Sequence, residues 1–230
     1  MLLHLLPDRT ADAAENMALD FLMLQRYPDA DHLRLRHYDW RRPACTFGYS
    51  QKIAFVRAQL PQPGLDLTRR ATGGGIVDHT EDWTFCLVIP RAHPLWADPG
   101  PSVYRSIHES MTHALRGLGG RVRLESRTPE APAGVCFNRA EINDVVLEST
   151  GAKVAGAAMK RNKRGLLFQG SIWKPLLPDL DWEAFGEAYA HRLAADAGVR
   201  VEEPGWPDFD PDEESGLIDQ YASSEWIEAR

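Results

Sequence analysis

Cysteine is scarce in this chain of 230 residues, and long apolar runs are absent. The three cysteines, Cys45, Cys86 and Cys136, lie far apart and form no C-x-x-C pair. Their odd number and wide spacing exclude a disulfide framework and a cysteine zinc site. No run approaches the roughly 18 apolar residues of a membrane-spanning helix. The apolar start of the chain is short and lacks the basic residues of a signal peptide. We therefore expect a cytoplasmic protein that has no membrane partner.

An excess of positive charge is also missing. The net charge is −7, and residues 202–230 hold ten acidic residues against one arginine, so the remaining chain carries +2. Nucleic-acid binding needs a basic stripe, so we expect no nucleic-acid partner and interpret the acidic end as a solvated surface. With 43% hydrophobic and 26% charged residues, and without repeats, the composition is that of one globular domain.

The hydrophobic pattern predicts an α+β fold, with a central mixed, largely antiparallel sheet flanked by helices. Apolar residues at helical spacing follow Asp12-x-x-Glu15, which has the form of a capping box, and Ser102 and Asp181 are the expected caps of later helices. Several expected strands adjoin in hairpins rather than alternating with helices. The expected strands are 33–38, 44–49, 84–89, 144–147, 153–159 and 166–173; the expected helices are 12–26, 102–118, one from 181, and a short one at 217–227 after a loop over 202–215.

A short segment combines two arginines, three glycines and a histidine. Arg69 and Arg70 precede Gly73-Gly74-Gly75, and His79 follows. Consecutive glycines adopt positive φ and bring amide groups close to a ligand oxygen, while arginines add charge and paired donors. The segment therefore predicts a cradle for a phosphate or carboxylate. A tight turn beside two solvated arginines is the alternative.

A second group of polar residues lies between positions 143 and 171. Lys153 falls on an expected strand, and small residues follow it, which leaves room for a ligand against the strand. Asp144 lies nine positions earlier, so the two side chains face each other across a predicted hairpin, as a site or as a plain salt bridge. The Lys160–Arg164 run is interpreted as an exposed hairpin tip. The other candidate residues here are Asn143, Gly156, Ala158, Gln169, Gly170 and Ser171.

Taken together, these segments resemble the lipoate-protein ligase family, within the group of biotin and lipoate attachment enzymes. The resemblance runs from about Ala14 to Ile172. It is carried by four ordered motifs: Arg69-Arg70-x-x-Gly73-Gly74-Gly75-x-Val77-x-His79, Asn143-Asp144-Val145, Lys153-Val154-x-Gly156-x-Ala158, and Gly170-Ser171. It implies a biotin/lipoate ligase-like catalytic domain over residues 1–200, an acidic extension over 201–230 and no separate accessory domain.

The resemblance also implies roles, substrates and partners. A lipoate-protein ligase activates lipoate or octanoate with ATP and Mg²⁺, keeps no permanently bound cofactor, and attaches the acyl group to a lysine of an acceptor. Arg70 and the Gly73–Gly75 amides would line the acyl and phosphate site. Lys153 would contact the acyl carbonyl and the α-phosphate, and Asp144 with Asn143 would hold Mg²⁺ or the nucleotide. The implied acceptors are the lipoyl domains of 2-oxoacid dehydrogenases or the glycine cleavage H protein. The remaining implied substrate-binding residues are Arg69, His79, Gly156, Ala158, Gln169, Gly170 and Ser171.

Three departures from the family pattern open alternatives. Asp82-Trp83 stands where the family commonly has Gly-Asn, Gln169 stands where it has histidine, and only about 60 residues follow Ser171. That length cannot hold the large C-terminal domain of many single-chain ligases, so activation with ATP would need a separate accessory subunit or would not occur. Octanoyltransferases and lipoyl amidotransferases of this fold use a cysteine thioester instead, with acyl carrier protein as a possible donor. Cys136 occupies the place of that cysteine.

The sequence favours the ATP-dependent ligase over the transferase, because Asn143-Asp144 matches the ligase pattern. A third alternative is a non-catalytic protein that keeps the acyl pocket or serves as an accessory to a partner. An unrelated nucleotide-binding enzyme is disfavoured, because the glycine segment lacks the Gly-Lys-Ser/Thr ending of a P-loop and the spacing of a dinucleotide fingerprint.

Overall fold

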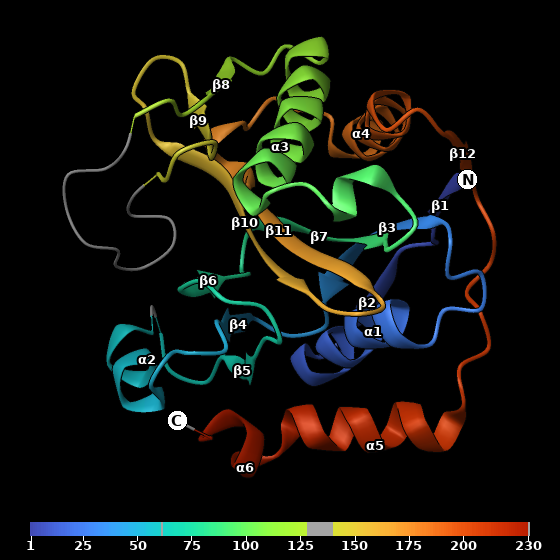
Figure 1. Cartoon of the computed structure of the whole chain (residues 1–230). Helices are drawn as coiled ribbons and strands as arrows, with labels where there is room; N and C mark the ends of the chain where they lie inside the picture. Colours follow the sequence, from blue (N-terminus) through green and yellow to red (C-terminus); the bar gives the residue numbers. More distant parts are fainter. Residues whose placement is uncertain (61, 128–139, 230) are drawn as a thin grey trace.

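The main sheet is mixed and mostly antiparallel. A computed structural model of the chain describes residues 1–60, 62–127 and 140–229. Within these residues nine strands form one sheet in the order β12-β1-β3-β7-β11-β10-β9-β8, with β2 beside β3, and three more form a small sheet in the order β5-β4-β6 (Figure 1). This arrangement confirms the predicted α+β class. The strands are β1 (Leu2–Leu5), β2 (Arg9–Ala11), β3 (Leu33–Trp40), β4 (Ala44–Phe47), β5 (Asp66–Arg69), β6 (Ile76–Asp78), β7 (Asp82–Pro90), β8 (Val122–Leu124), β9 (Val145–Leu147), β10 (Lys153–Arg161), β11 (Gly165–Trp173) and β12 (Arg200–Glu202).

The centre of the sheet is built from its longest strands. Every residue of β7 is buried, as its apolar run predicts for a strand covered on both faces. β7 pairs antiparallel with β3 and β11, and β11 pairs with β10 through a hairpin. The Oδ1 atom of Asn162 accepts from the amides of Arg164 and Gly165 and closes the hairpin turn. Lys163 and Arg164 are exposed there, which confirms the predicted hairpin tip.

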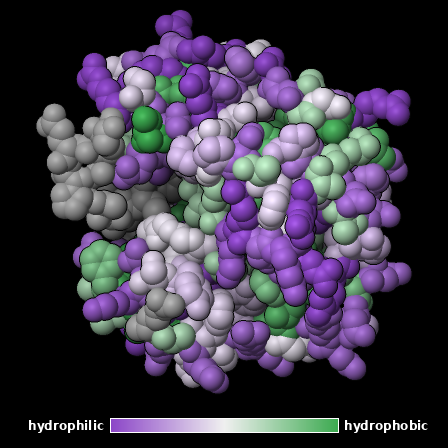
Figure 2. All heavy atoms as spheres, in the orientation of Figure 1, coloured by the Kyte–Doolittle hydropathy of each residue, from purple (hydrophilic) through white to green (hydrophobic). Residues whose placement is uncertain are grey.

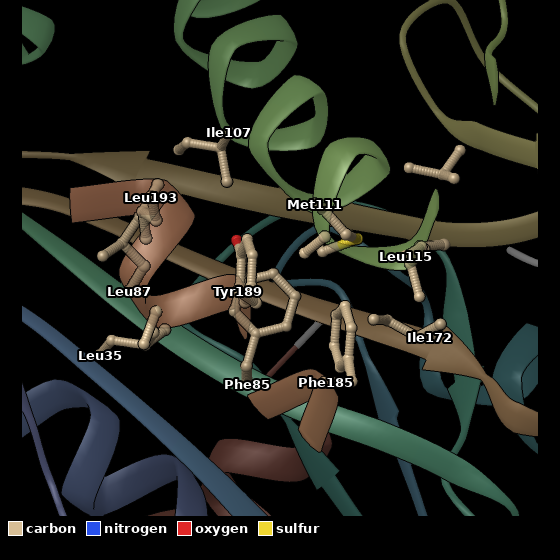
Figure 3. Packing of buried hydrophobic residues seen from close by; sticks show 14 of the residues in the cluster. Leu35, Phe85, Leu87, Ile107, Met111, Leu115, Ile172, Phe185, Tyr189 and Leu193 are labelled. Atoms are coloured by element: carbon tan, nitrogen blue, oxygen red, sulfur yellow. The ribbon is translucent and has the colours of Figure 1, made fainter. Parts of the chain in front are cut away.

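Helices cover both faces of the main sheet. α3 (Gly100–Gly117) and α4 (Trp182–Asp196) lie on one face, and α1 (Ala13–Gln25) lies on the other (Figure 1). Alternate residues of β7 divide between the two layers. Phe85 and Leu87 pack with Tyr189 of α4 and Met111 of α3, whereas Cys86 belongs to the cluster formed with α1 (Figure 3). The polar site described below lies at the edge of these two cores.

Of the three predicted helix caps, one is confirmed, one is confirmed in position only, and one is wrong. Asp12 occupies the predicted N-cap position of α1. Asp12 precedes α1 without a side-chain capping bond, because its carboxylate pairs with Arg41 and Arg42 at 3.0 and 3.1 Å. α3 begins at Gly100, two residues before Ser102. Asp181 does cap α4, since its side chain accepts from the amide of Ala184.

The C-terminal residues contain more helix than their composition predicts. α5 (Pro211–Ala222) begins inside the predicted loop, and α6 (Ser224–Ile227) follows it. Asp210 caps α5, and the next three acidic residues occupy its first turn, where the helix dipole stabilises negative charge. One side of α5 packs against α1. The division into residues 1–200 and 201–230 stays a prediction.

The outer surface is largely polar. Figure 2 shows hydrophilic residues over most of the face it draws, with hydrophobic residues in small separate groups. Among the described helices, none is long and apolar enough to cross a membrane. The remaining elements are α2 (Ile53–Gln59) and two short 3-10 helices, Pro94–Trp96 and Lys174–Leu176.

Candidate functional site

Two adjoining cavities lie where the glycine segment approaches β10. The first is narrow, about 50 Å³, and the second is wide, about 900 Å³. Gly74, Lys153 and Ala157 line both cavities, so they stand at the junction. A ligand with a slender apolar part and a larger polar part fits this division.

Small and apolar residues form much of the wall of the narrow cavity. Met17 of α1 lines it opposite the Gly156–Ala158 stretch of β10, and Val77 and Gly170 complete the apolar part. The absence of large side chains on β10 leaves the space beside the strand. Met17 is unbranched and flexible, so its movement would widen the cavity for a chain of several carbons.

The glycine segment is held by Arg70 and by the strand β4 next to it. Arg70 donates to the carbonyl oxygens of Gly73 and Gly75 at 2.9 and 3.1 Å, and to Thr46 Oγ1 at 2.8 Å. Gly74 has a φ of +87°, a conformation that glycine adopts without strain. A Cβ on Gly48 would lie only 2.1 Å from the Gly74 carbonyl oxygen, so this close approach also requires glycine. Carbonyl groups of the predicted cradle are therefore engaged by the Arg70 guanidinium.

Lys153 is fixed by a buried carboxylate. Its Nζ lies 2.8 Å from Asp144 Oδ2, and Asp144 is fully buried. The Tyr104 hydroxyl of α3 donates to Asp144 Oδ1 and accepts from the Ala157 amide at 2.8 Å. The Glu141 amide donates to Asp144 Oδ2 at 2.7 Å. This arrangement confirms the predicted pairing across the hairpin and holds the ammonium at the junction of the two cavities.

A buried histidine lies behind this pair. His108 Nδ1 is 2.7 Å from the Asn143 carbonyl oxygen, and burial lowers the pKa of His108 to about 4. The neutral ring therefore donates from Nδ1. Asn143 has a φ of +68°, which asparagine tolerates better than most residues, and this turn directs its carbonyl to the histidine. Side chains of α3 thus hydrogen-bond to both Asn143 and Asp144.

The polar end of the narrow cavity contains a hydrogen-bonded network. His79 Nδ1 lies 2.7 Å from Asp82 Oδ2, and its Nε2 lies 2.7 Å from Thr46 Oγ1. Thr84 and Ser171 also donate to Asp82 Oδ2. Asp82 is one of the departures from the family pattern, since it stands where the family commonly has glycine. In the fold this carboxylate organises three neighbouring side chains instead.

Gln169 belongs to a second buried network on the α1 side. Its amide nitrogen donates to Asp20 Oδ2 at 2.6 Å, and its carbonyl accepts from Thr72 Oγ1 at 2.7 Å. Asp20 forms a fully buried ion pair with Arg36 at 2.6 Å. Gln169 therefore ties the glycine segment to α1, a positioning task that needs no titratable group.

Most of the predicted site residues meet at these two cavities, and Arg69 does not. Arg69 is directed toward carbonyl oxygens of the C-terminal helix and of the segment before α2, and it lines neither cavity, so its predicted role in substrate binding stays a prediction. Gly73 contacts Arg70 without lining either cavity, and Cys136 lies outside the described residues. The predicted residues that line a cavity are Arg70, Gly74, Gly75, His79, Asn143, Asp144, Lys153, Gly156, Ala158, Gln169, Gly170 and Ser171.

Several cavity residues escape sequence reasoning. Thr46 and Thr84 look like ordinary strand residues, and nothing in their sequence context distinguishes them. Tyr104 and His108 carry a signal, because two polar aromatic residues four positions apart fall on the buried face of a helix. Buried polar side chains require partners, so such a pair points to a polar site beneath the helix.

The implied Mg²⁺ does not fit at Asp144 in this arrangement. Mg²⁺ is bound by oxygen ligands with open coordination positions. Both carboxylate oxygens of Asp144 accept hydrogen bonds, and one of them faces the Lys153 ammonium. In the part of the chain that the structure describes, no group of three or more His, Cys, Asp or Glu residues is placed to hold a metal ion.

The profile of the lipoyl protein ligase A/B catalytic domain matches residues 12–199, so the chain belongs to that family. The structure of a putative lipoate protein ligase from T. acidophilum with bound lipoic acid superposes with a TM-score of 0.76. It is 20% identical and covers 100% of both chains, which shows the common fold.

Relatives found by sequence similarity are named octanoyltransferases rather than ligases. The octanoyltransferase LipM of Geobacillus kaustophilus is 31% identical over 183 residues, covering 74% of this chain and 63% of that protein. The octanoyltransferase LipM of Anoxybacillus flavithermus is 30% identical over 183 residues, covering 75% of this chain and 65% of that protein. This chain thus spans just under two thirds of the length of these relatives.

Proposed function

We propose that this chain transfers an octanoyl or lipoyl group to a lysine of a lipoyl-acceptor domain. The observation that carries the proposal is the position of Lys153, whose ammonium lies between a narrow apolar cavity and a wide cavity. An acyl chain lying along β10 in the narrow cavity has its carbonyl at Lys153. Its activating group then occupies the wide cavity.

In this position Lys153 binds the acyl carbonyl oxygen. Attack on the carbonyl carbon moves negative charge onto that oxygen, and a fixed ammonium stabilises this charge best when it need not reorient. The Asp144 carboxylate, 2.8 Å away, holds the ammonium in this position. Gly74 and Gly75 line the wide cavity, on the side of the activating group, whereas Arg70, which holds the glycine segment, lines the narrow cavity.

We favour the thioester route over the adenylate. The Cys136 thiolate attacks the acyl donor, a thioester forms and the donor thiolate leaves. The neutral amine of the acceptor lysine then attacks this thioester, so an amide forms, the Cys136 thiolate departs and the proton lost by the amine is released to solvent. Two observations support this choice: relatives at 30 and 31% identity are named octanoyltransferases, and the Asp144 oxygens are engaged by protein donors.

The second candidate is the ATP-dependent ligase that the sequence motifs favour. It forms an acyl-adenylate, and the wide cavity of about 900 Å³ has room for a nucleotide. The resemblance in fold to a putative lipoate protein ligase with bound lipoic acid supports it.

The two routes are separated by their donors. A purified apo lipoyl domain is incubated with the protein in two arms, octanoyl-acyl carrier protein without ATP, and octanoate or lipoate with Mg²⁺–ATP, and its mass is measured. Cys136→Ala is tested in both arms, with Cys45→Ala as a matched control, since Cys45 is buried in a separate cluster.

Each outcome decides between the candidates. Modification in the acyl carrier arm alone, abolished by Cys136→Ala and retained in Cys45→Ala, supports the thioester transferase. Modification that requires ATP and is indifferent to Cys136 supports the ligase and overturns the thioester route. No modification in either arm, with the wild-type protein folded, contradicts the transferase and a ligase that acts alone, and favours a non-catalytic acyl-binding or accessory protein.

A further inference from the structure

Arg69 joins two segments that are far apart in the sequence. Its guanidinium is fully buried. Nε and Nη2 donate to the carbonyl oxygens of Trp226 and Ile227 at 3.0 and 2.8 Å. Nη1 donates to the carbonyl oxygens of Tyr49 and Gln51 at 2.6 and 2.9 Å. One side chain therefore links α6 to the segment that leads into α2.

The C-terminal side of this link is itself well anchored. Trp226 Nε1 donates to the Arg69 carbonyl oxygen at 2.8 Å, so the residue is held through both its side chain and its backbone. Thr68 donates to the Tyr221 carbonyl at 2.7 Å, and Ser223 caps α6. α5 and α6 run beneath β5 and α1 in Figure 1, and they lie outside the family match of residues 12–199.

The other side of the link leads directly to the glycine segment. The Tyr49 amide donates to the Thr72 carbonyl at 2.8 Å, and the Gln51 side chain donates to the Gly74 carbonyl at 3.1 Å. The Gly48 amide donates to the Gly75 carbonyl at 3.1 Å. Residues 48–51 thus hold the glycine segment along its length, and Gly74 lines both cavities.

We propose that Arg69 is a positioning residue through which the C-terminal helix α6 holds the glycine segment in the shape that receives the acyl substrate. Three successive glycines have the greatest backbone freedom of any tripeptide, so their shape must be imposed by their neighbours. A buried guanidinium that bonds four carbonyl groups fixes those neighbours more firmly than a single lysine ammonium would. The inference rests on the proposed acyl-transfer function.

The test compares Arg69→Lys with a matched control. Arg34 is also buried, and its guanidinium donates to three backbone carbonyls, those of Met23, Ala30 and His32, away from the cavities. Arg34→Lys therefore removes the same kind of contact without touching the glycine segment. Hydrogen exchange of backbone amides is measured for both variants without substrate, and transfer kinetics are measured with octanoyl-acyl carrier protein or with octanoate and Mg²⁺–ATP.

In Arg69→Lys we expect amides of residues 48–51 and 72–75 to exchange about ten-fold faster while β7 and β11 stay protected. KM for the acyl substrate should rise about ten-fold, with kcat within about two-fold. Arg34→Lys should leave the amide exchange of residues 48–51 and 72–75 unchanged, and it should leave KM and kcat unchanged. Equal kinetic constants in the two lysine variants, or faster exchange confined to residues 224–229, would overturn the proposal.

A shortened chain tests the same link from its other end. A chain that ends at Ser223 lacks α6 and should show the same faster exchange at residues 72–75. If this chain and Arg69→Lys both lose exchange protection throughout β7, α6 supports the whole fold rather than the glycine segment, and the proposal is wrong. A wild-type protein that transfers no acyl group contradicts the proposed function. Amide exchange is measured without substrate, so its result still tests whether Arg69 connects α6 to the glycine segment.

Discussion

The Lys153 ammonium and the Asp144 carboxylate form a buried pair, 2.8 Å apart, at the junction of the two cavities. The pair joins the start of β10 to the turn before β9 and is held from α3 by Tyr104. A buried ion pair contributes little net stability, but loss of one partner leaves an uncompensated charge. In the proposed function, this fixed ammonium is the group that meets the acyl carbonyl oxygen.

Lys153→Ala should abolish acyl transfer while the protein still folds, because the group that meets the carbonyl oxygen is gone. The unpaired Asp144 carboxylate should lower the free energy of unfolding by about 3 kcal/mol. Lys163→Ala, at the exposed tip of the same hairpin, should match wild type in both respects. The mass-shift assay and urea unfolding measure the two effects. Wild-type turnover in Lys153→Ala would remove the assignment of this site.

Gly156→Ala should displace the ammonium without removing it. A Cβ at this position would lie 2.5 Å from both Cε and Nζ of Lys153. Since the lysine end is flexible, we expect a small change in stability and a loss of kcat/KM of about 100-fold, as a misplaced catalytic group produces. The control is Gly216→Ala in α5, where a Cβ meets no atom within 4 Å and should stabilise the helix. Unchanged kcat/KM in Gly156→Ala would show that the Lys153 position is not critical.

Gly48→Ala should disrupt the glycine segment from the side of β4. Its Cβ would fall 2.1 Å from the Gly74 carbonyl oxygen, a backbone atom that cannot move alone. We expect an unfolding free energy lower by about 1–3 kcal/mol, as for other overpacked sites, and weaker binding of octanoate in calorimetry. Gly205→Ala, with open space around its Cβ, is the matched substitution. Octanoate affinity equal in the two variants would contradict the close packing described here.

His108 should make stability depend on pH between about 6.5 and 4. Burial lowers its pKa to about 4 in the folded chain, so between these values the unfolded chain binds more protons. Stability from the neutral ring is full above pH 6.5 and is lost as the pH falls, by about 3 kcal/mol in total. His108→Asn keeps a donor toward the Asn143 carbonyl but cannot titrate.

Urea unfolding at pH 7 and pH 5 measures this effect. Wild type should lose more stability than His108→Asn between the two values, since carboxylates affect both proteins alike. Equal losses in the two proteins would show that the ring is not held neutral by burial.

Local patterns were sufficient for much of this protein. The apolar run of β7 predicts a buried central strand, Asn162 and Gly165 predict the hairpin turn, and the spacing of Asp144 and Lys153 predicts that they meet. These features depend on residues close together along the chain. The family match over residues 12–199 also follows from the sequence alone.

The tertiary structure decided the rest, because other residues take their roles from distant partners. Asp12 has the form of a helix cap, yet nearby arginines engage it. Asp82 departs from the family pattern in the sequence, but in the fold its carboxylate accepts hydrogen bonds from His79 and Ser171. Arg69 and Arg70 are neighbours in the sequence, and their side chains leave β5 in opposite directions, one to the C-terminal helix and one to the glycine segment. A strand sends successive side chains to opposite faces, and only the folded chain determines what each face meets.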